Sequence, residues 1–178
     1  MLRSSENLFL RCSASGTCPA QSTARVCKLL KTNIENGDQG YDAATDRLLA
    51  CGVRNVLLKL GSRGCVIAQG NLPKEHVPAF CVNAVDTTAA GDAFNAGFAV
   101  GLMRGSTVAR SAVFASAVAT ISVTRPGAQP STPTGEVVEC FLGEHSITNR
   151  TRAVPYKAGL MTPKTQLTIE SAGFRCTR

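Results

Sequence analysis

A polar loop at residues 86–92 carries the side chains best suited to chemistry. It reads Asp-Thr-Thr-Ala-Ala-Gly-Asp and lies between an extended segment and a helical pattern. Ala89, Ala90 and Gly91 lack bulky side chains, so their backbone N–H groups can converge on an anion. They precede a helix, whose unsatisfied N-terminal donors and dipole favour negative charge. Such a loop suits a phosphate, or the charge that develops on a phosphoryl group during transfer.

Asp92 falls in the first turn of the helix that follows the loop. A carboxylate there could accept the proton of a hydroxyl group that attacks a bound phosphoryl group. Alternatively, Asp92 only caps the helix. The spacing alone does not decide between these two interpretations.

The elements around the loop are predicted from periodicity and turn residues. Before it, a helix from about Thr45 to Gly52 leads into an apolar strand at 56–60, a turn at 61–64 and a second strand at 65–68. Extended segments at 76–85 follow, broken at Pro78. After the loop, two helices are expected, the first ending at 105–106, where Ser106 caps the second, and the second ending at Pro126-Gly127. Both carry Gly and Ala at their packing positions, which lets their backbones approach closely.

Composition sets the broad class of the protein. The chain has 178 residues, 44% of them hydrophobic and 5% aromatic, which suits one folded domain and excludes wholesale disorder. No apolar run reaches the roughly 20 residues that a membrane span needs. Glu6 and Arg11 interrupt any secretory signal, so a soluble protein without a membrane partner is expected.

The net charge of +7 raises the question of a nucleic-acid partner. Residues 1–36 hold five basic and two acidic residues, and residues 143–178 hold six and two, whereas residues 37–142 are balanced. The excess therefore lies in the two ends rather than on a folded face, which favours solvated tails over nucleic-acid binding.

The eight cysteines do not form a recognisable framework. None stands in a C-x-x-C pair, and His76 and His145 lie far from any cysteine cluster, which argues against zinc. Without an export signal, reduced thiols in the cytoplasm are expected.

Three blocks of sequence resemble the ribokinase/PfkB family of sugar kinases. Residues 85–97, which include the loop, resemble the C-terminal motif of that family; residues 122–131 resemble the stretch that follows it, and residues 52–64 the nucleotide-side strand and turn. The blocks occur in the family's order. The resemblance implies an α/β fold, a three-layer α/β/α sandwich with a mostly parallel central sheet, truncated here at its N-terminal side.

The resemblance also implies roles for individual residues. Asp92 would be the catalytic base, and Ala89, Ala90 and Gly91 would form an anion hole around the transferred phosphate. An activating monovalent cation, usually K⁺, would be held by Asp86, Thr88, Ser122, Arg125, Gly127 and Ser131. ATP, with Mg²⁺, would be contacted by Asn33, Lys59, Gly61, Ser62, Gly64, Gly91 and Ser116.

The regions outside these blocks differ from the family. We expect a poorly specified segment at 1–36, the nucleotide-binding and catalytic part at 37–142 and a basic tail at 143–178. The family's Asn-x-x-Glu motif has a remnant at residues 33–36, where Asn36 replaces the Glu. The N-terminal half that supplies most sugar contacts is missing, so an apolar sheet edge would be exposed and would promote a homodimer.

The sequence therefore leaves three alternative functions. The first is an ATP-dependent carbohydrate kinase acting on ribose to give the 5-phosphate. The second is an inactive fragment that binds nucleotide or serves as an interaction module. The third, a nucleic-acid-associated protein, rests only on the basic ends and predicts steeply salt-dependent binding.

Overall fold

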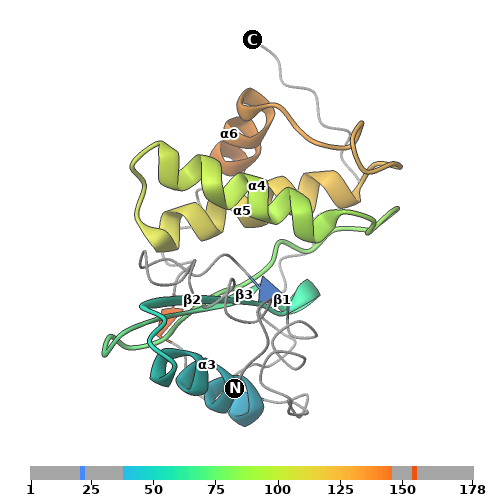
Figure 1. Cartoon of the computed structure of the whole chain (residues 1–178). Coiled ribbons are helices and arrows are strands. Elements are labelled where there is room, and N and C mark those ends of the chain that lie inside the picture. The colour runs from blue at the N-terminus through green and yellow to red at the C-terminus, as the bar shows by residue number, and fades with distance from the viewer. Residues whose placement is uncertain (1–20, 23–37, 146–153, 156–178) are drawn as a thin grey trace, which may run out of the picture. The chain divides into compact units, whose positions relative to one another are not determined.

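The computed structural model describes residues 21–22, 38–145 and 154–155 (Figure 1). Most of the expected N-terminal segment, the predicted ATP contact Asn33 and most of the basic tail lie outside these residues. Within the described ranges, no helix combines the length and the apolar character needed to cross a membrane.

Strands and helices alternate in the first half of the described chain, and helices dominate the second. The elements are β1 (Gln21–Ser22), α3 (Asp38–Ala50), β2 (Asn55–Lys59), η2 (Gly61–Arg63), β3 (Cys65–Gln69), β4 (Glu75–Val77), α4 (Ala90–Met103), α5 (Val108–Val123), α6 (Gly135–Glu144) and β5 (Val154–Pro155). The strands form one sheet in the order β1-β2-β3-β4-β5.

The sheet is mixed at the strand pairs whose register is defined. β2 runs parallel to β1 and antiparallel to β3, with Leu57 opposite Ile67. The predicted strand-turn-strand at 56–68 is confirmed, and the short turn explains the antiparallel pairing, since parallel neighbours need a longer crossover. Leu57 and Ile67 are buried, as are Leu58 and Val66 beside them, so both faces of this hairpin are covered.

The described chain divides into two compact units, of which the first contains α3, β2 and β3. Its core joins one face of α3 to the hairpin through Tyr41, Ala44, Leu48, Val53, Val56, Leu58, Leu60, Val66 and Ala68. The helix begins at Asp38, earlier than the predicted start near Thr45. The roughly two added turns are stabilised by burial of Tyr41, which shares a helical face with Ala44 and Leu48.

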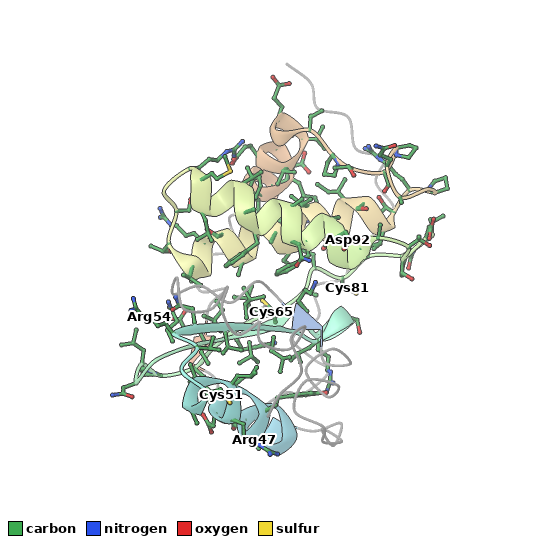
Figure 2. All side chains as sticks on the ribbon, viewed as in Figure 1. Arg47, Cys51, Arg54, Cys65, Cys81 and Asp92 are labelled. Carbon is green, nitrogen blue, oxygen red and sulfur yellow. The ribbon has the colours of Figure 1, made fainter. Side chains whose placement is uncertain are left out.

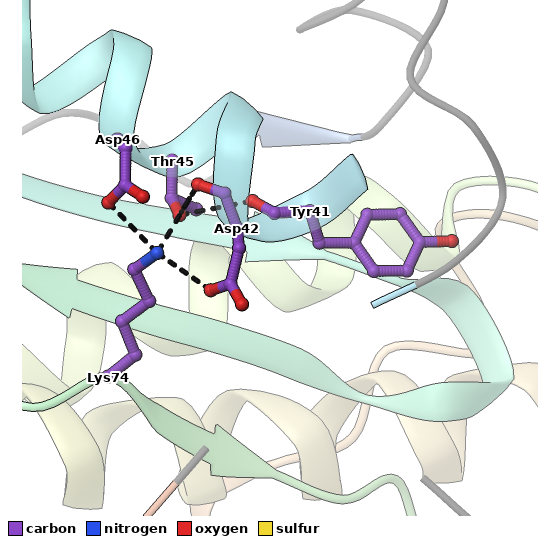
Figure 3. Close-up of polar contacts among 5 residues, drawn as sticks. All are labelled: Tyr41, Asp42, Thr45, Asp46 and Lys74. Atoms are coloured by element: carbon purple, nitrogen blue, oxygen red, sulfur yellow. Dashed lines mark hydrogen bonds and ion pairs between the residues drawn. The ribbon is translucent and has the colours of Figure 1, made fainter. Parts of the chain in front are cut away.

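Lys74, in the segment after β3, forms ion pairs with two aspartates of α3 in this first unit (Figure 3). Its Nζ lies 2.7 Å from Asp42 Oδ1 and 2.9 Å from Asp46 Oδ1, and it also donates to the Asp42 carbonyl at 3.2 Å. Burial alone would lower the pKa of Lys74, but hydrogen bonds to the two carboxylates outweigh burial and hold that pKa above its usual value. All three N–H groups of this ammonium therefore have oxygen partners on α3, and its role is structural.

The second unit is built on α4 and α5, which lie side by side (Figure 1). Their close approach depends on small residues, as predicted: a Cβ added at Gly97 would lie 2.9 Å from the Val118 side chain, and one at Gly101 would lie 2.8 Å from the Ser111 Cα. The N-cap of α5 is Thr107, not the predicted Ser106, because the helix starts at Val108 and Thr107 Oγ1 accepts the Arg110 N–H at 3.3 Å.

Helix α6 packs against α5 in the same unit. Phe80, from the segment after β4, packs edge-on against Phe141 of α6, and both contribute to a core that includes Val118 and Ile121. Arg104, which follows α4, lies over the Phe114 ring and pairs with Glu139 of α6. The loop before α6 contains three of the predicted site residues, Arg125, Gly127 and Ser131.

Candidate functional site

The loop before α4 forms a tight turn that ends in a strained residue. Ala89 is the N-cap of α4 and has a left-handed backbone with φ of 61°, the one positive φ outside glycine among the described residues. The Ala90 N–H donates to the Thr87 carbonyl at 3.2 Å, and the Ala89 carbonyl accepts the N–H groups of Asp92 and Ala93, both at 2.9 Å. The small residues thus turn the chain directly into the helix.

Asp92 is the third residue of α4 and is exposed to solvent (Figure 2). It does not occupy the N-cap position, which belongs to Ala89, and no side chain caps this helix end. The interpretation of Asp92 as the N-cap residue is therefore wrong. A carboxylate beside an N-terminus, reachable from solvent, is positioned to receive a proton from a bound molecule.

Asp86 joins the loop to a second loop that follows α5. Its Oδ1 accepts the Thr88 N–H at 2.8 Å, and its Oδ2 accepts the Gly127 N–H at 2.9 Å. These hydrogen bonds, first those of Thr88 and then that of Gly127, lower the pKa of Asp86 below its usual value. The carboxylate is therefore ionised at neutral pH and links the two loops.

The Val123 carbonyl provides a further anchor that sequence reasoning missed. It accepts the N–H groups of Val85 at 2.7 Å and of Asp86 at 3.2 Å, so the end of α5 holds the start of the loop. Any residue can supply such a carbonyl, and the side chain of Val123 gave no signal of it.

Ser122 and Ser131 lie close together at the base of the second loop. Their hydroxyl groups are 2.9 Å apart and both residues are buried, while Ser131 Oγ also donates to the Ala128 carbonyl at 3.2 Å. Arg125 continues the turn after α5, its N–H bonded to the Ser122 carbonyl at 3.2 Å. Five of the six residues of the predicted cation site thus lie in these two loops of the second unit, and Ser122 lies in the last turn of α5.

The turn that is predicted to contact the nucleotide follows the end of β2. Lys59 and Gly61 belong to the first unit, whereas Ser62 and Gly64 fall in the second. Gly64 has φ of 89°, and a Cβ there would lie 2.0 Å from the Val77 carbonyl oxygen, so only glycine fits. Ser116, the predicted adenine contact, is buried in α5 with 5% of its surface exposed.

No three His, Cys, Asp or Glu residues gather into a metal-binding group within the described ranges. The predicted cation site has a single carboxylate, Asp86, and otherwise hydroxyl and backbone oxygens. The Asp86 carboxylate accepts the N–H groups of Thr88 and Gly127 and a side-chain hydrogen bond from Thr88, and it keeps acceptor capacity for one further partner. One carboxylate with hydroxyl and backbone oxygens is an oxygen-only set, unlike the nitrogen and sulfur ligands that are typical of Zn²⁺.

Comparison with known proteins assigns the family. The model of the pfkB family of carbohydrate kinases matches residues 22–135. A ribokinase of Haemophilus influenzae is 40% identical over 95 residues, which cover 53% of this chain and 30% of that protein. This chain therefore spans about a third of the length of that curated relative.

Solved structures give the same assignment. Ribokinase of Thermotoga maritima is 37% identical with a TM-score of 0.64, and the match covers 78% of this chain and 44% of that one. A ribokinase of Arabidopsis thaliana, whose structure was solved with ribose and ATP, is 31% identical with a TM-score of 0.64, covering 69% and 39%. The α/β ribokinase-like fold is thereby confirmed for the matched part, and the chain belongs to the pfkB family of carbohydrate kinases.

Proposed function

We propose that this chain carries the phosphoryl-transfer site of an ATP-dependent sugar kinase that converts ribose into ribose 5-phosphate. The observation that carries the proposal is the position of Asp92, exposed in the first turn of α4 directly after the Ala89-Ala90-Gly91 turn. Ribose is chosen because the similar proteins include ribokinases, one of them solved with ribose and ATP.

In the proposed reaction, the sugar hydroxyl oxygen attacks the γ-phosphorus of ATP. The bond from that phosphorus to the β–γ bridging oxygen breaks, ADP leaves, and the hydroxyl proton passes to the Asp92 carboxylate. The backbone N–H groups of the turn would stabilise the charge on the phosphoryl oxygens. The Ala90 N–H is bonded to the Thr87 carbonyl at 3.2 Å, near the long end of the hydrogen-bond range, so a phosphoryl oxygen can compete for it.

The loops around Asp86 are proposed to hold a monovalent cation such as K⁺. The proposed ligands are oxygen atoms of Asp86, Thr88, Ser122, Arg125, Gly127 and Ser131. The cation would act through loop geometry, because Asp86 already connects Gly127 to the turn that precedes Asp92. Mg²⁺ would enter with ATP to neutralise its phosphates.

The proposed nucleotide contacts come from the turn after β2, from α5 and from the segment before α3. The residues proposed to contact ATP in this turn are Lys59, Gly61, Ser62 and Gly64, and Ser116 would lie near the adenine. Asn33 completes the proposed set but lies outside the described residues. A cytoplasmic location belongs to the same proposal, supported by Cys51, Cys65 and Cys81, which form no disulfide within the described residues.

The second candidate function is a nucleotide-binding module without transfer activity. It is favoured by one observation, that the match covers 30% of the Haemophilus ribokinase, so most of that relative's length has no counterpart in the matched residues. Correct placement of the attacking hydroxyl supplies a large part of catalysis, and its loss would leave binding without turnover.

The test is transfer of labelled γ-phosphate from ATP to ribose, with Mg²⁺ and K⁺ present. Wild type and Asp92→Ala are compared, with circular dichroism showing that both are folded. Turnover that disappears in Asp92→Ala supports the kinase. A folded wild-type chain that binds ATP but transfers no phosphate contradicts it and selects the binding module.

A further inference from the structure

One buried side chain, Phe80, lies in the segment that leads to the loop with Asp92. The structure describes every residue from 78 to 92, and within this range Phe80 alone is buried, with 4% of its surface exposed. Val85, further along, is 65% exposed. Residues 78–89 lie between β4 and α4 and belong to neither, and we call them the linking segment. The position of the linking segment therefore depends strongly on what holds Phe80.

Two aromatic rings at the end of α6 hold Phe80 in place. The Phe80 ring lies edge-on to Phe141, with ring centroids 4.7 Å apart, and edge-on to His145 at 5.7 Å. Phe141 and His145 stack on each other at 4.2 Å, and His145 Nδ1 lies 2.6 Å from the Phe141 carbonyl oxygen. Edge-on aromatic pairs have a defined geometry that an aliphatic side chain does not reproduce. These contacts therefore fix the place of Phe80 more narrowly than burial alone would.

The near end of the linking segment packs against the turn that is proposed to contact ATP. A Cβ added at Gly64 would lie 2.7 Å from the Ala79 nitrogen, and it would lie closer still to the Val77 carbonyl oxygen. Gly64 and residues 77–79 all belong to the second unit. Ala79 directly precedes Phe80 in the chain. A shift of Phe80 would therefore move the backbone on which the turn at Gly64 rests.

The far end of the linking segment leads into α4. The N–H groups of Val85 and Asp86 donate to the Val123 carbonyl at 2.7 and 3.2 Å. Ala93, in the first turn of α4, belongs to the same buried core as Phe80. Phe80 is therefore connected on one side to the proposed ATP turn and on the other to the helical turn that carries the proposed base.

We propose that Phe80 is a positioning residue that fixes the loop with the proposed base relative to the turn that contacts ATP. The inference rests on the proposed function, in which Asp92 takes the proton of the hydroxyl group that attacks the γ-phosphate. A displacement of about 1 Å in a reacting geometry can cost about 10²-fold in rate. Loss of the Phe80 ring should therefore lower the rate of phosphate transfer more than it lowers the affinity for ATP.

Hydrogen exchange read by NMR tests the position of the loop without any need for activity. Phe80→Leu removes the ring, and Phe114→Leu is the matched control, because Phe114 packs against the same core but lies in α5. Exchange at the Val85 and Asp86 amides should quicken by about tenfold in Phe80→Leu, relative to amides in the middle of α5, and should stay unchanged in the control. An equal effect of both variants, or no effect of Phe80→Leu, overturns the proposal.

Kinetics on the full chain separate position from binding. With saturating ATP, Phe80→Leu should lower the rate of phosphate transfer to ribose by about tenfold or more and leave the Kd for ATP within about twofold of wild type. Phe114→Leu should change neither. A weaker affinity for ATP with an unchanged transfer rate contradicts the positioning role. A wild-type chain that binds ATP but transfers no phosphate contradicts the proposed function instead, and the exchange result then decides by itself whether Phe80 fixes the loop.

Discussion

Asp86 Oδ2 accepts the backbone N–H of Gly127 at 2.9 Å and so ties together two loops that are 41 residues apart in the chain. The other oxygen of the same carboxylate accepts the Thr88 N–H in the turn that leads to Asp92. One side chain thus connects the end of α5 to the start of α4. The geometry before the proposed base depends on this connection.

Loss of the Asp86 carboxylate should loosen both loops. Asp86→Ala removes both acceptors, whereas Asp86→Asn keeps one carbonyl oxygen and presents an amide N–H₂ to the second donor. Amide exchange at Gly127 and Thr88 should quicken by about tenfold in the Ala variant and less in the Asn variant. Hydrogen exchange read by NMR measures both amides, and unchanged exchange in Asp86→Ala would show that the bonds do not hold the loops.

A fall in pH should weaken the hydrogen bonds through which Asp86 links the two loops. Because the folded-state pKa of Asp86 is lowered, its stabilising effect is present above the unfolded-state pKa of about 3.9 and is lost as the pH falls through the lower folded-state value. The melting temperature of wild type should exceed that of Asp86→Asn by a constant margin above about pH 5. That margin should shrink below about pH 4, and a margin that grows in acid would contradict the assignment.

Relief of the strain at Ala89 should stabilise the protein. Its φ of 61° disfavours any side chain, and Ala89→Gly should raise the free energy of unfolding by about 0.5–1 kcal/mol. The matched control is Ala99→Gly, on the exposed face within α4, which should lower it by about 1 kcal/mol. Urea denaturation measures both variants, and a loss of stability in both would refute the strained conformation.

The packing of α4 on α5 should not tolerate a methyl group at Gly101. A Cβ there would lie 2.8 Å from the Ser111 Cα, which is backbone and cannot swing away, so Gly101→Ala should cost about 1–3 kcal/mol despite the better helix propensity of Ala. Gly143 in α6 has nothing within 4 Å of the same position, and Gly143→Ala should be neutral or stabilising. Thermal unfolding of the two variants tests this prediction. Equal shifts of their melting temperatures would contradict the tight contact between α4 and α5.

The thiol of Cys65 should be inert in the folded chain. Burial raises its pKa to about 12, with a smaller opposing effect from Lys59, so almost no thiolate forms at neutral pH. Of the four cysteines that the structure describes, Cys51 is the exposed one and should be alkylated before the other three (Figure 2). Peptide mapping by mass spectrometry after brief alkylation should find Cys65 unmodified until denaturant is added. Early modification of Cys65 would show that the hairpin opens readily.

Local patterns predicted much of this structure. The strand-turn-strand at 56–68 followed from apolar runs around Gly61 and Gly64, and the two helices after the loop followed from their apolar spacing. The start of α3 was misplaced because Gly37, Asp38 and Gly40 are typical turn residues, while burial of Tyr41 sustains the helix. Helix α6 was not predicted, since its apolar residues contact Phe80 and α5, which are distant in sequence.

The candidate site was predictable in its residue types but not in its connections. The loop at 86–92 stood out by its small residues and two aspartates. The bonds from Asp86 to Gly127 and from Val85 to the Val123 carbonyl join distant segments through backbone atoms, which carry no signature in side-chain spacing. The pairing of the Ser122 and Ser131 hydroxyl groups likewise depends on the path of the chain between them.

The most direct test of the account is to separate binding from chemistry at Asp92. Asp92→Asn preserves the size of the side chain but removes the proton acceptor, and both forms are measured for ATP affinity and for the rate of phosphate transfer to ribose. We expect equal ATP affinity in the two forms and a transfer rate reduced by about 10²–10⁴-fold in Asp92→Asn. An unchanged transfer rate in the variant would contradict the assignment of Asp92 as the catalytic base.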